Sequence, residues 1–257
     1  MNARTADLAP PLLFGAAVLA LWEAGVRLLG VPAIILPAPS AIFLRLATSV
    51  PTLAADFVQT IQGVLAGYAL GSAAGLAVAI LIDRSPFLQR GLLPLGNLVS
   101  ALPIVGIAPI MVMWFGFDWQ SKAAVVVVMT FFPMLVNATA GLSSAGAMER
   151  DLMKTYAADY FQTLGKLRLP AALPFVFNAL KINTTLAMIG AIVAEFFGTP
   201  TVGMGFRIST EVGHLSIDMV WATIFVAAVA GSSFYAIVSL IERRATFWHA
   251  SYRGRES

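Results

Sequence analysis

Long runs without a charged residue alternate with short polar segments along this chain. The charge-free runs are 57–82, 91–117, 123–148 and 219–241. Each exceeds the roughly 20 residues that an α-helix needs to cross a hydrocarbon core of ~30 Å. Two further segments, 11–29 and 171–197, carry a few charges but are predominantly apolar. The pattern predicts an all-α polytopic membrane protein with about six transmembrane helices.

The composition strengthens this prediction. Hydrophobic residues make up 59% of the 257 residues and charged residues only 11%, which is far from the balance of a soluble domain. We interpret the first apolar segment as an uncleaved helix, because no small-residue cleavage site with a polar mature start follows it. Within it, Glu23 and Arg27 are four residues apart and are expected to pair on one helical face. The predicted organisation is an N-terminal helix with a proline-rich connection (1–55), a transmembrane core (56–242) and a basic tail (243–257).

The distribution of Lys and Arg predicts the orientation of the chain. With a cytoplasmic N-terminus, eleven of these residues fall on the cytoplasmic side: Arg4, Arg84, Arg90, Arg150, Lys154, Lys166, Arg168, Arg243, Arg244, Arg253 and Arg255. Four fall outside: Arg27, Arg45, Lys122 and Arg207. Because cytoplasmic loops carry the excess of positive charge, both termini are predicted to be cytoplasmic. The net charge of +3 then reflects contact with membrane lipid at the inner face. No nucleic-acid partner is expected, since no folded polar domain carries a basic cluster.

Residues suited to chemistry are scarce. Cysteine is absent, and His214 and His249 have no companion at ligand spacing, so we expect no metal site. No P-loop, zincin or nucleophile-elbow pattern occurs, and neither a cofactor nor an enzymatic activity is expected. Two classes of protein remain open: a transporter subunit powered by another protein, and a self-sufficient carrier or channel driven by an ion gradient.

Two ionisable residues stand in the fifth predicted span. Lys181 lies about two turns from its inner end and Glu195 near its outer end. Such residues either line an aqueous path or snorkel toward opposite interfaces, and the sequence leaves both interpretations open. A self-sufficient carrier would be expected to have more ionisable positions of this kind. We therefore favour the powered subunit.

Small residues and prolines mark two other spans. The second span repeats glycine every four residues, which puts Gly63, Gly67, Gly71 and Gly75 on one face. This spacing favours close packing against another helix. The third span contains Pro94, Pro103 and Pro109 and is expected to be bent or interrupted. A broken helix beside a pathway and a kinked packing helix both satisfy the pattern.

An amphipathic segment interrupts the apolar chain between Ala145 and Pro170. On a helix, one stripe would carry Leu152, Tyr156, Tyr160 and Leu164, with Met153 and Phe161 beside it. A stripe of this kind requires a surface, either lipid headgroups or a partner protein. Periodicity alone does not distinguish the two.

The stretch from Asp151 to Pro170, DLMKTYAADYFQTLGKLRLP, resembles the cytoplasmic signature of type I ATP-binding-cassette (ABC) import permeases. Asp151 takes the acidic place and Ala157 the glycine place, and Leu167 with Leu169-Pro170 closes the motif. Further similarity to the nitrate, sulfonate and taurine branch extends over about 200 residues, at Trp22-Glu23, Leu36–Ser40, Trp114–Gly116, Phe131–Pro133 and Val193–Glu195. Because alanine disfavours positive φ, we expect the loop to be straighter or differently bent here.

This resemblance implies a type I ABC importer fold whose loop is a coupling helix on a separate cytoplasmic ATPase. The residues assigned to ATPase coupling are Asp151, Lys154, Tyr156, Ala157, Tyr160, Phe161, Leu164 and Gly165. The resemblance also implies an outer substrate-binding protein, a homodimer and a bacterial inner-membrane location. The implied cargo is a small nutrient such as a sulfonate, nitrate, taurine or a pyrimidine-type vitamin precursor.

Overall fold

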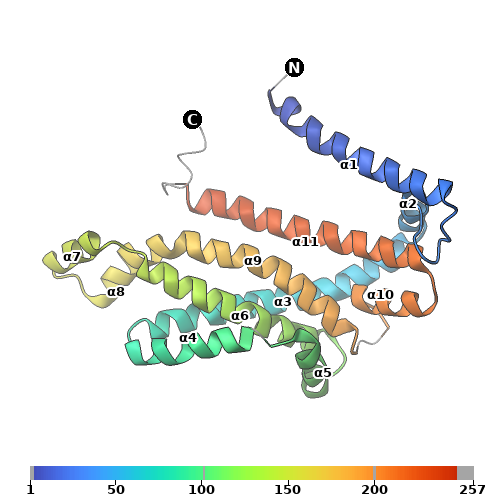
Figure 1. The fold of residues 1–257 in the computed structure, drawn as a ribbon. Helices are drawn as coiled ribbons and strands as arrows, with labels where there is room; N and C mark the ends of the chain where they lie inside the picture. Colours follow the sequence, from blue (N-terminus) through green and yellow to red (C-terminus); the bar gives the residue numbers. More distant parts are fainter. Residues whose placement is uncertain (1–2, 101, 199–200, 248–257) are drawn as a thin grey trace.

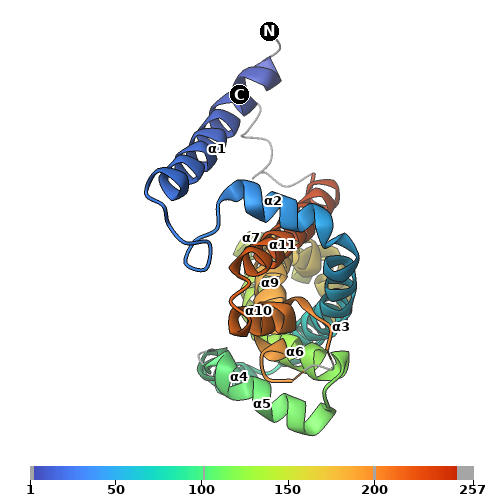
Figure 2. The ribbon, with the colours of Figure 1, turned by 90° about the vertical axis from the view of Figure 1, so that its right-hand side faces the viewer.

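The computed structural model describes residues 3–100, 102–198 and 201–247, and every regular element within them is helical. Five helices are long: α1 (Ala3–Leu28), α3 (Val50–Ile82), α6 (Trp119–Ser143), α9 (Leu169–Glu195) and α11 (Ile217–Ala245). The shorter elements are α2 (Pro39–Thr48), α4 (Pro86–Ser100), α5 (Ile104–Phe115), α7 (Ala147–Thr155), α8 (Tyr160–Thr163), a π-helical turn (Leu164–Arg168) and α10 (Met204–Gly213). Helices α3, α6, α9 and α11 form an elongated bundle (Figures 1 and 2).

The predicted third span is interrupted. Helices α4 and α5 replace it, and Pro103 is the N-cap of α5 with φ −68° and ψ 120°. Proline disfavours helical geometry in the residue before it and lacks the N–H that would continue the ladder. Pro94 and Pro109 lie inside α4 and α5 without ending them. Among the described residues, five helices rather than six are therefore long and apolar enough to span a membrane.

The glycine repeat of α3 lies directly against α6. Gly63, Gly67, Gly71 and Gly75 are all buried. A Cβ atom at Gly67 would lie 2.5 Å from Val126 Cβ and 2.6 Å from the Ala123 carbonyl oxygen. No side chain fits this separation, so the repeat allows the two backbones to approach closely. In a bilayer such van der Waals contact drives helix association.

A buried amide joins three helices at the centre of the bundle. Asn183 of α9 is fully buried, and its Nδ2 donates to Ser72 Oγ of α3 at 3.0 Å and to the Thr130 carbonyl of α6 at 2.8 Å. Apolar residues of the same helices surround this centre, among them Val64, Val126 and Ala187. A polar group inside a bilayer needs such partners. The amide therefore helps to set the register of α9 against α3 and α6.

Most of helix α1 stands apart from the bundle (Figures 1 and 2), and only its C-terminal end approaches it, where the rings of Trp22 and Trp221 of α11 are 5.0 Å apart. None of its most apolar 18-residue window is buried within the chain. Its C-terminal end is fastened to α2, because Arg27 Nε donates to Glu23 Oε1 at 2.5 Å and the Ser40 backbone N–H donates to Glu23 Oε2 at 3.0 Å. The predicted pairing of Glu23 with Arg27 is confirmed.

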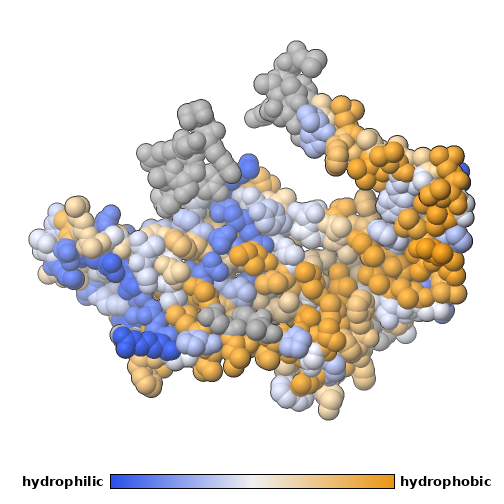
Figure 3. Space-filling model, in the orientation of Figure 1, coloured by the Kyte–Doolittle hydropathy of each residue, from blue (hydrophilic) through white to orange (hydrophobic). Residues whose placement is uncertain are grey.

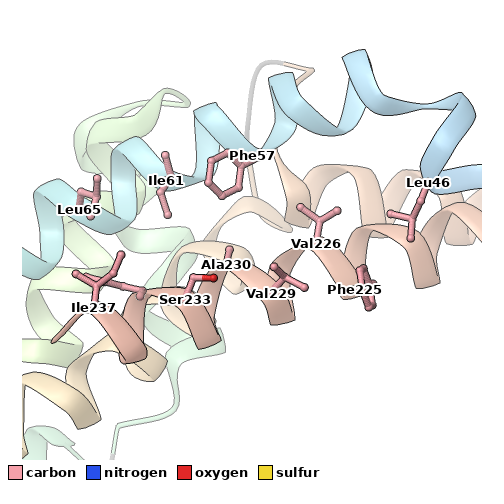
Figure 4. Close-up of a pocket in the computed structure, with 11 residues that line it drawn as sticks. Leu46, Phe57, Ile61, Leu65, Phe225, Val226, Val229, Ala230, Ser233 and Ile237 are labelled. Atoms are coloured by element: carbon pink, nitrogen blue, oxygen red, sulfur yellow. The ribbon is translucent and has the colours of Figure 1, made fainter. Parts of the chain in front are cut away.

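On the face of the molecule drawn in Figure 3, hydrophilic residues are more frequent at one end than elsewhere. Figure 3 shows hydrophilic residues gathered over α7 and α8, while hydrophobic residues cover much of the remaining face. An open groove of about 450 Å³ runs between α3 and α11, and Ser233 is the only hydroxyl-bearing residue in its lining (Figure 4). Apolar surface of this kind is expected of helices that face lipid. The end with α7 and α8 is the loop end of the molecule, and the end with α2 and α10 is its far end (Figure 1).

Candidate functional site: the loop between α6 and α9

Two short helices, not one, form the amphipathic loop. Helix α7 ends at Thr155 with Tyr156 as its C-cap, and Ala157 adopts a left-handed conformation with φ 51°. The N–H of Ala157 donates to the Lys154 carbonyl at 2.8 Å, and the N–H of Ala158 donates to the Met153 carbonyl at 3.0 Å. This pair of bonds is the Schellman arrangement that ends many helices, usually with glycine at the left-handed position.

The expectation of a straighter loop is therefore wrong in one respect: Ala157 makes the turn despite its Cβ. The conformation costs a non-glycine residue roughly 1–2 kcal/mol, and the two hydrogen bonds offset that cost. Beyond the turn, Asp159 begins α8 with a capping box, in which its side chain accepts from the Gln162 N–H at 2.7 Å and Gln162 Oε1 accepts from the Asp159 N–H at 3.1 Å. Hydrogen bonds thus stabilise both the end of α7 before the bend and the start of α8 after it.

The bend divides the predicted stripe into an exposed part and an anchored part. Tyr156 is 75% exposed and Phe161 is 69% exposed, and Met148 and Leu152 of α7 are exposed as well. Helix α7 has no buried residue. The Asp151 carboxylate accepts from Lys154 Nζ at 2.9 Å, which lowers the pKa of Asp151. An apolar surface with a charged rim is thus left open to a partner.

Tyr160 and Leu164 belong to the anchored part. Leu164 is buried against Leu142 of α6 and Ala172 of α9, so it does not lie on the open face predicted for it. The Tyr160 hydroxyl donates to Asp83 Oδ2 at 3.0 Å. Gly165 has open space around it, with nothing within 4 Å of the position of a Cβ. The predicted single-helix stripe from Leu152 to Leu164 is therefore absent, because the turn at Ala157 rotates α8 out of line with α7.

An ion pair at the base of the loop joins α3 to the start of α9. Arg168 Nη1 donates to Asp83 Oδ2 at 2.6 Å, and Nη2 donates to Oδ1 at 2.5 Å. The Asp83 side chain is only 2% exposed and that of Arg168 is 17% exposed. Arg168 Nε also donates to the Leu142 carbonyl at the end of α6, at 2.9 Å. The sequence reasoning missed Asp83, although an acidic residue at a helix C-terminus, where the helix dipole disfavours it, is a signal for a compensating partner.

Lys181 forms a second ion pair. Its Nζ lies 2.7 Å from Glu242 Oε2 of α11, and both side chains are largely buried. The lysine is therefore not an isolated cation on the surface of α9.

Glu195 lies in a buried polar cluster at the far end. The Thr60 hydroxyl of α3 donates to Glu195 Oε1 at 2.8 Å, and the Gly205 N–H donates to Oε2 at 2.7 Å. The Met204 N–H donates to the same threonine oxygen at 2.9 Å. These bonds fasten the start of α10 to α3 and α9. Glu195 is only 2% exposed.

A further ion pair completes this far-end cluster. Asp56 of α3 is fully buried and accepts from Arg207 Nε of α10 at 2.8 Å and from the Gly203 N–H at 2.9 Å. The hydrogen bond from Arg207 to Asp56 raises the pKa of Arg207. Sequence reasoning identified Glu195 but not Asp56 or Thr60, whose partners lie far along the chain. Within the described residues, no group of three or more histidine and acidic side chains is arranged to hold a metal ion.

The fold and the loop define a helical membrane transport component. Residues 67–247 match the family model described as "Binding-protein-dependent transport system inner membrane component". The chain belongs to this family. That membership decides between the two classes left open by the sequence: the chain is the permease subunit of an ABC importer rather than a self-sufficient carrier.

Individual relatives agree with the family assignment. The chain is 30% identical over 239 residues to the formylaminopyrimidine transport permease protein ThiX of Halalkalibacterium halodurans, covering 93% of this chain and 95% of that protein. It is 29% identical to the putative aliphatic sulfonates transport permease protein SsuC of Bacillus subtilis, covering 95% and 88%. A crystal structure of an amino acid ABC transporter with histidines superposes with a TM-score of 0.62 at 15% identity, covering 79% of this chain and 98% of that one. The last likeness supports the fold alone.

Proposed function

We propose that the open face of α7 and α8 docks this permease onto a separate cytoplasmic ATPase subunit. Tyr156, Phe161, Met148 and Leu152 supply the apolar surface, with Asp151 and Lys154 at its rim. The single observation that carries the proposal is this exposed apolar face on the polar end of the bundle, outside the apolar belt that lipid would cover. An amphipathic helix with such a face fits a groove on a partner protein. Both chain termini would then lie on the cytoplasmic side with the loop.

Charges introduced into the open face test this docking. Tyr156→Asp with Phe161→Asp is expected to abolish recovery of the ATPase with the permease, because it desolvates two carboxylates in the interface. Thr185→Asn, on an exposed position of α9 far from the loop, serves as the control and should leave recovery intact. The measurement is the ATPase-to-permease ratio after affinity purification. Full recovery of the ATPase with the double variant would contradict the proposal.

Two copies of this chain would form the membrane unit, and a substrate-binding protein would deliver cargo at the far end. A homodimer supplies one loop to each of two ATPases by two-fold symmetry. The exposed apolar surface of α1 supports contacts beyond the chain itself, with membrane lipid or a second copy. Mass measurement of the purified complex tests this: two permease chains with two ATPases are expected, and a single permease chain would contradict it.

The cargo is proposed to be a small organic nutrient rather than an inorganic anion. The relatives of higher identity support an organic cargo: those named for formylaminopyrimidine, aliphatic sulfonates and riboflavin are 30%, 29% and 30% identical over 93%, 95% and 91% of this chain. Those named for nitrate and bicarbonate are 27% and 25% identical over only 74% and 67% of it. Uptake of a labelled aminopyrimidine or alkanesulfonate by cells that express the complete transporter is expected, and uptake of nitrate alone would contradict the proposal.

Glu195 is proposed to hold the outer end of the transport path closed, through its bonds to Thr60 and to the start of α10. Glu195→Gln replaces one acceptor oxygen by an amide NH₂ that cannot accept from its present donor. Uptake should therefore change in rate and in dependence on the binding protein. If uptake and its pH dependence remained unaltered, Glu195 would have a purely structural role.

A further inference from the structure

At the loop end, the loop is connected to α3 and to α9 by contacts that the docking face alone does not explain. Helix α8, the π-helical turn and α9 follow one another without a gap, so residues Tyr160 to Glu195 form one helical rod. Its 36 residues correspond to about 54 Å at 1.5 Å per residue. The second half of the loop is therefore a direct extension of α9, and any displacement of α8 is passed to α9 along the rod.

Helix α3 has no such covalent extension into the loop, and its connection is made by side chains. Asp83, the C-cap of α3, accepts two hydrogen bonds from Arg168 and a third from the Tyr160 hydroxyl. The guanidinium of Arg84 lies over the Tyr160 ring at 3.9 Å and over the Phe161 ring at 4.5 Å. Two consecutive residues directly after α3, Asp83 and Arg84, thus contact two consecutive residues of α8.

The stability of α3 alone does not explain why an acidic residue stands at its C-terminus. A carboxylate at the C-terminus of α3 is disfavoured by the helix dipole. Arg168 offsets this only through a two-point contact, which fixes the direction as well as the distance between the groups. Arg168 also ends a π-helical turn, an irregularity that is frequent at functional sites. With the Leu142 carbonyl as its third partner, its guanidinium joins the loop ends of α3, α6 and α9.

We propose that Asp83 and Arg168 are a positioning pair that makes the loop, α3 and α9 move as one body when the ATPase binds nucleotide. This inference rests on the proposed docking function and adds the route by which movement enters the bundle. Without the pair, a displacement of the loop would move α9, which is continuous with α8, but would not move α3. With it, the glycine repeat of α3 carries the movement on to α6, because those two backbones are in close contact.

The test compares loop and α3 positions in the complex of this permease with its ATPase. Spin labels are attached through Thr155→Cys in α7 and Leu81→Cys in α3, both exposed positions. The chain has no native cysteine, so no background has to be removed. The distance between the labels is measured by pulsed electron resonance without nucleotide and with ATP plus vanadate. In the otherwise unaltered chain, this distance should stay constant.

The double variant Asp83→Asn with Arg168→Gln removes the ion pair without leaving an unpaired charge. It should still bring down the ATPase, since the exposed face remains, but ATP plus vanadate should now shift the label distance by about 2 Å or more, the scale of helix shifts in switching proteins. Arg244→Gln is the control, because it removes an exposed guanidinium at the same end with no ion pair among the described residues. It should behave like the unaltered chain.

Three results would overturn the inference: a nucleotide-dependent shift in the unaltered chain, no shift in the double variant, or loss of the ATPase from the double variant. The last would mean that the pair only builds the docking face. Restoration of a constant distance by the exchanged pair Asp83→Arg with Arg168→Asp would support the inference further. Failure of the ATPase to bind the unaltered chain would instead contradict the proposed function, so the two outcomes remain distinct.

Discussion

The two ends of the bundle use polar residues in opposite ways. At the far end, Asp56, Thr60 and Glu195 are all buried, and their partners include backbone N–H groups of Gly203 and Gly205. At the loop end, the Asp83 pair is enclosed, but the face beyond it leaves large apolar side chains exposed. A fully satisfied buried cluster favours one closed arrangement. An exposed apolar face remains unsatisfied until a partner covers it.

The largest expected effect comes from removing the buried acid of the far end. Asp56→Ala leaves Arg207 and the Gly203 N–H without their partner and should destabilise the protein by about 3–5 kcal/mol. Its counterpart at the loop end, Asp151→Ala, breaks an ion pair whose side chains are both more than two-thirds exposed and should have no measurable effect. Thermal unfolding of the purified chains in detergent measures both. Equal losses would show that the two ends do not differ in this way.

A smaller effect is expected from adding a methyl group at each end. At Gly205 the new Cβ would overlap the Ile192 carbonyl and lie 2.8 Å from Glu195 Cβ, whereas at Gly165 it would meet nothing within 4 Å. Gly205→Ala should therefore cost about 1–3 kcal/mol through overpacking. Gly165→Ala should be neutral or slightly stabilising, because alanine favours helix. The same unfolding measurement applies, and a neutral Gly205→Ala would mean that the far end is less tightly packed than its bonds indicate.

The smallest effect concerns the turn of the loop. Ala157→Gly relieves the left-handed strain at φ 51° but gives the unfolded chain more freedom, so a net stabilisation of about 1 kcal/mol is expected. Because only the loop is affected, limited proteolysis between α7 and α8 should slow by a few-fold. Ala158→Gly, next to it and without positive φ, is the control and should not slow cleavage. Faster cleavage of Ala157→Gly would mean that alanine is preferred at this turn.

Sequence periodicity predicted the helices well where the determining residues are neighbours along the chain. The four-residue glycine spacing identified the face of α3 that contacts α6, and Glu23 was correctly paired with Arg27. The third span was expected to be bent or interrupted, and the break before Pro103 follows from the local restrictions of proline. Its division left five long apolar helices instead of six. The prediction of six spans was based on the length of the apolar segments, which does not show that the third segment is divided into the two shorter helices α4 and α5.

Long-range pairing was beyond the reach of the sequence. Arg168 and Asp83 are 85 residues apart, and Arg207 and Asp56 are 151 apart, so nothing local links them. The prediction of a single apolar stripe along the loop was wrong for a different reason. A helical projection assumes an unbroken helix, and one positive φ at Ala157 was enough to leave Tyr156 exposed while turning Leu164 into the core. Alanine at that place was a poor signal for a turn that hydrogen bonds nevertheless stabilise.

The amino-acid sequence by itself determined the class of the protein: a membrane chain of apolar helices with one amphipathic loop near its middle. These properties depend on hydrophobic length and on residues close in sequence, which bilayer thickness and helical periodicity convert directly into structure. Only the tertiary structure decided which charged side chains form buried ion pairs and which apolar surfaces remain exposed. This outcome depends on where helices that are far apart in the chain come together. Burial and the position of partners, not residue type, place Asp83 in an ion pair that connects α3 to α9 and leave Tyr156 exposed.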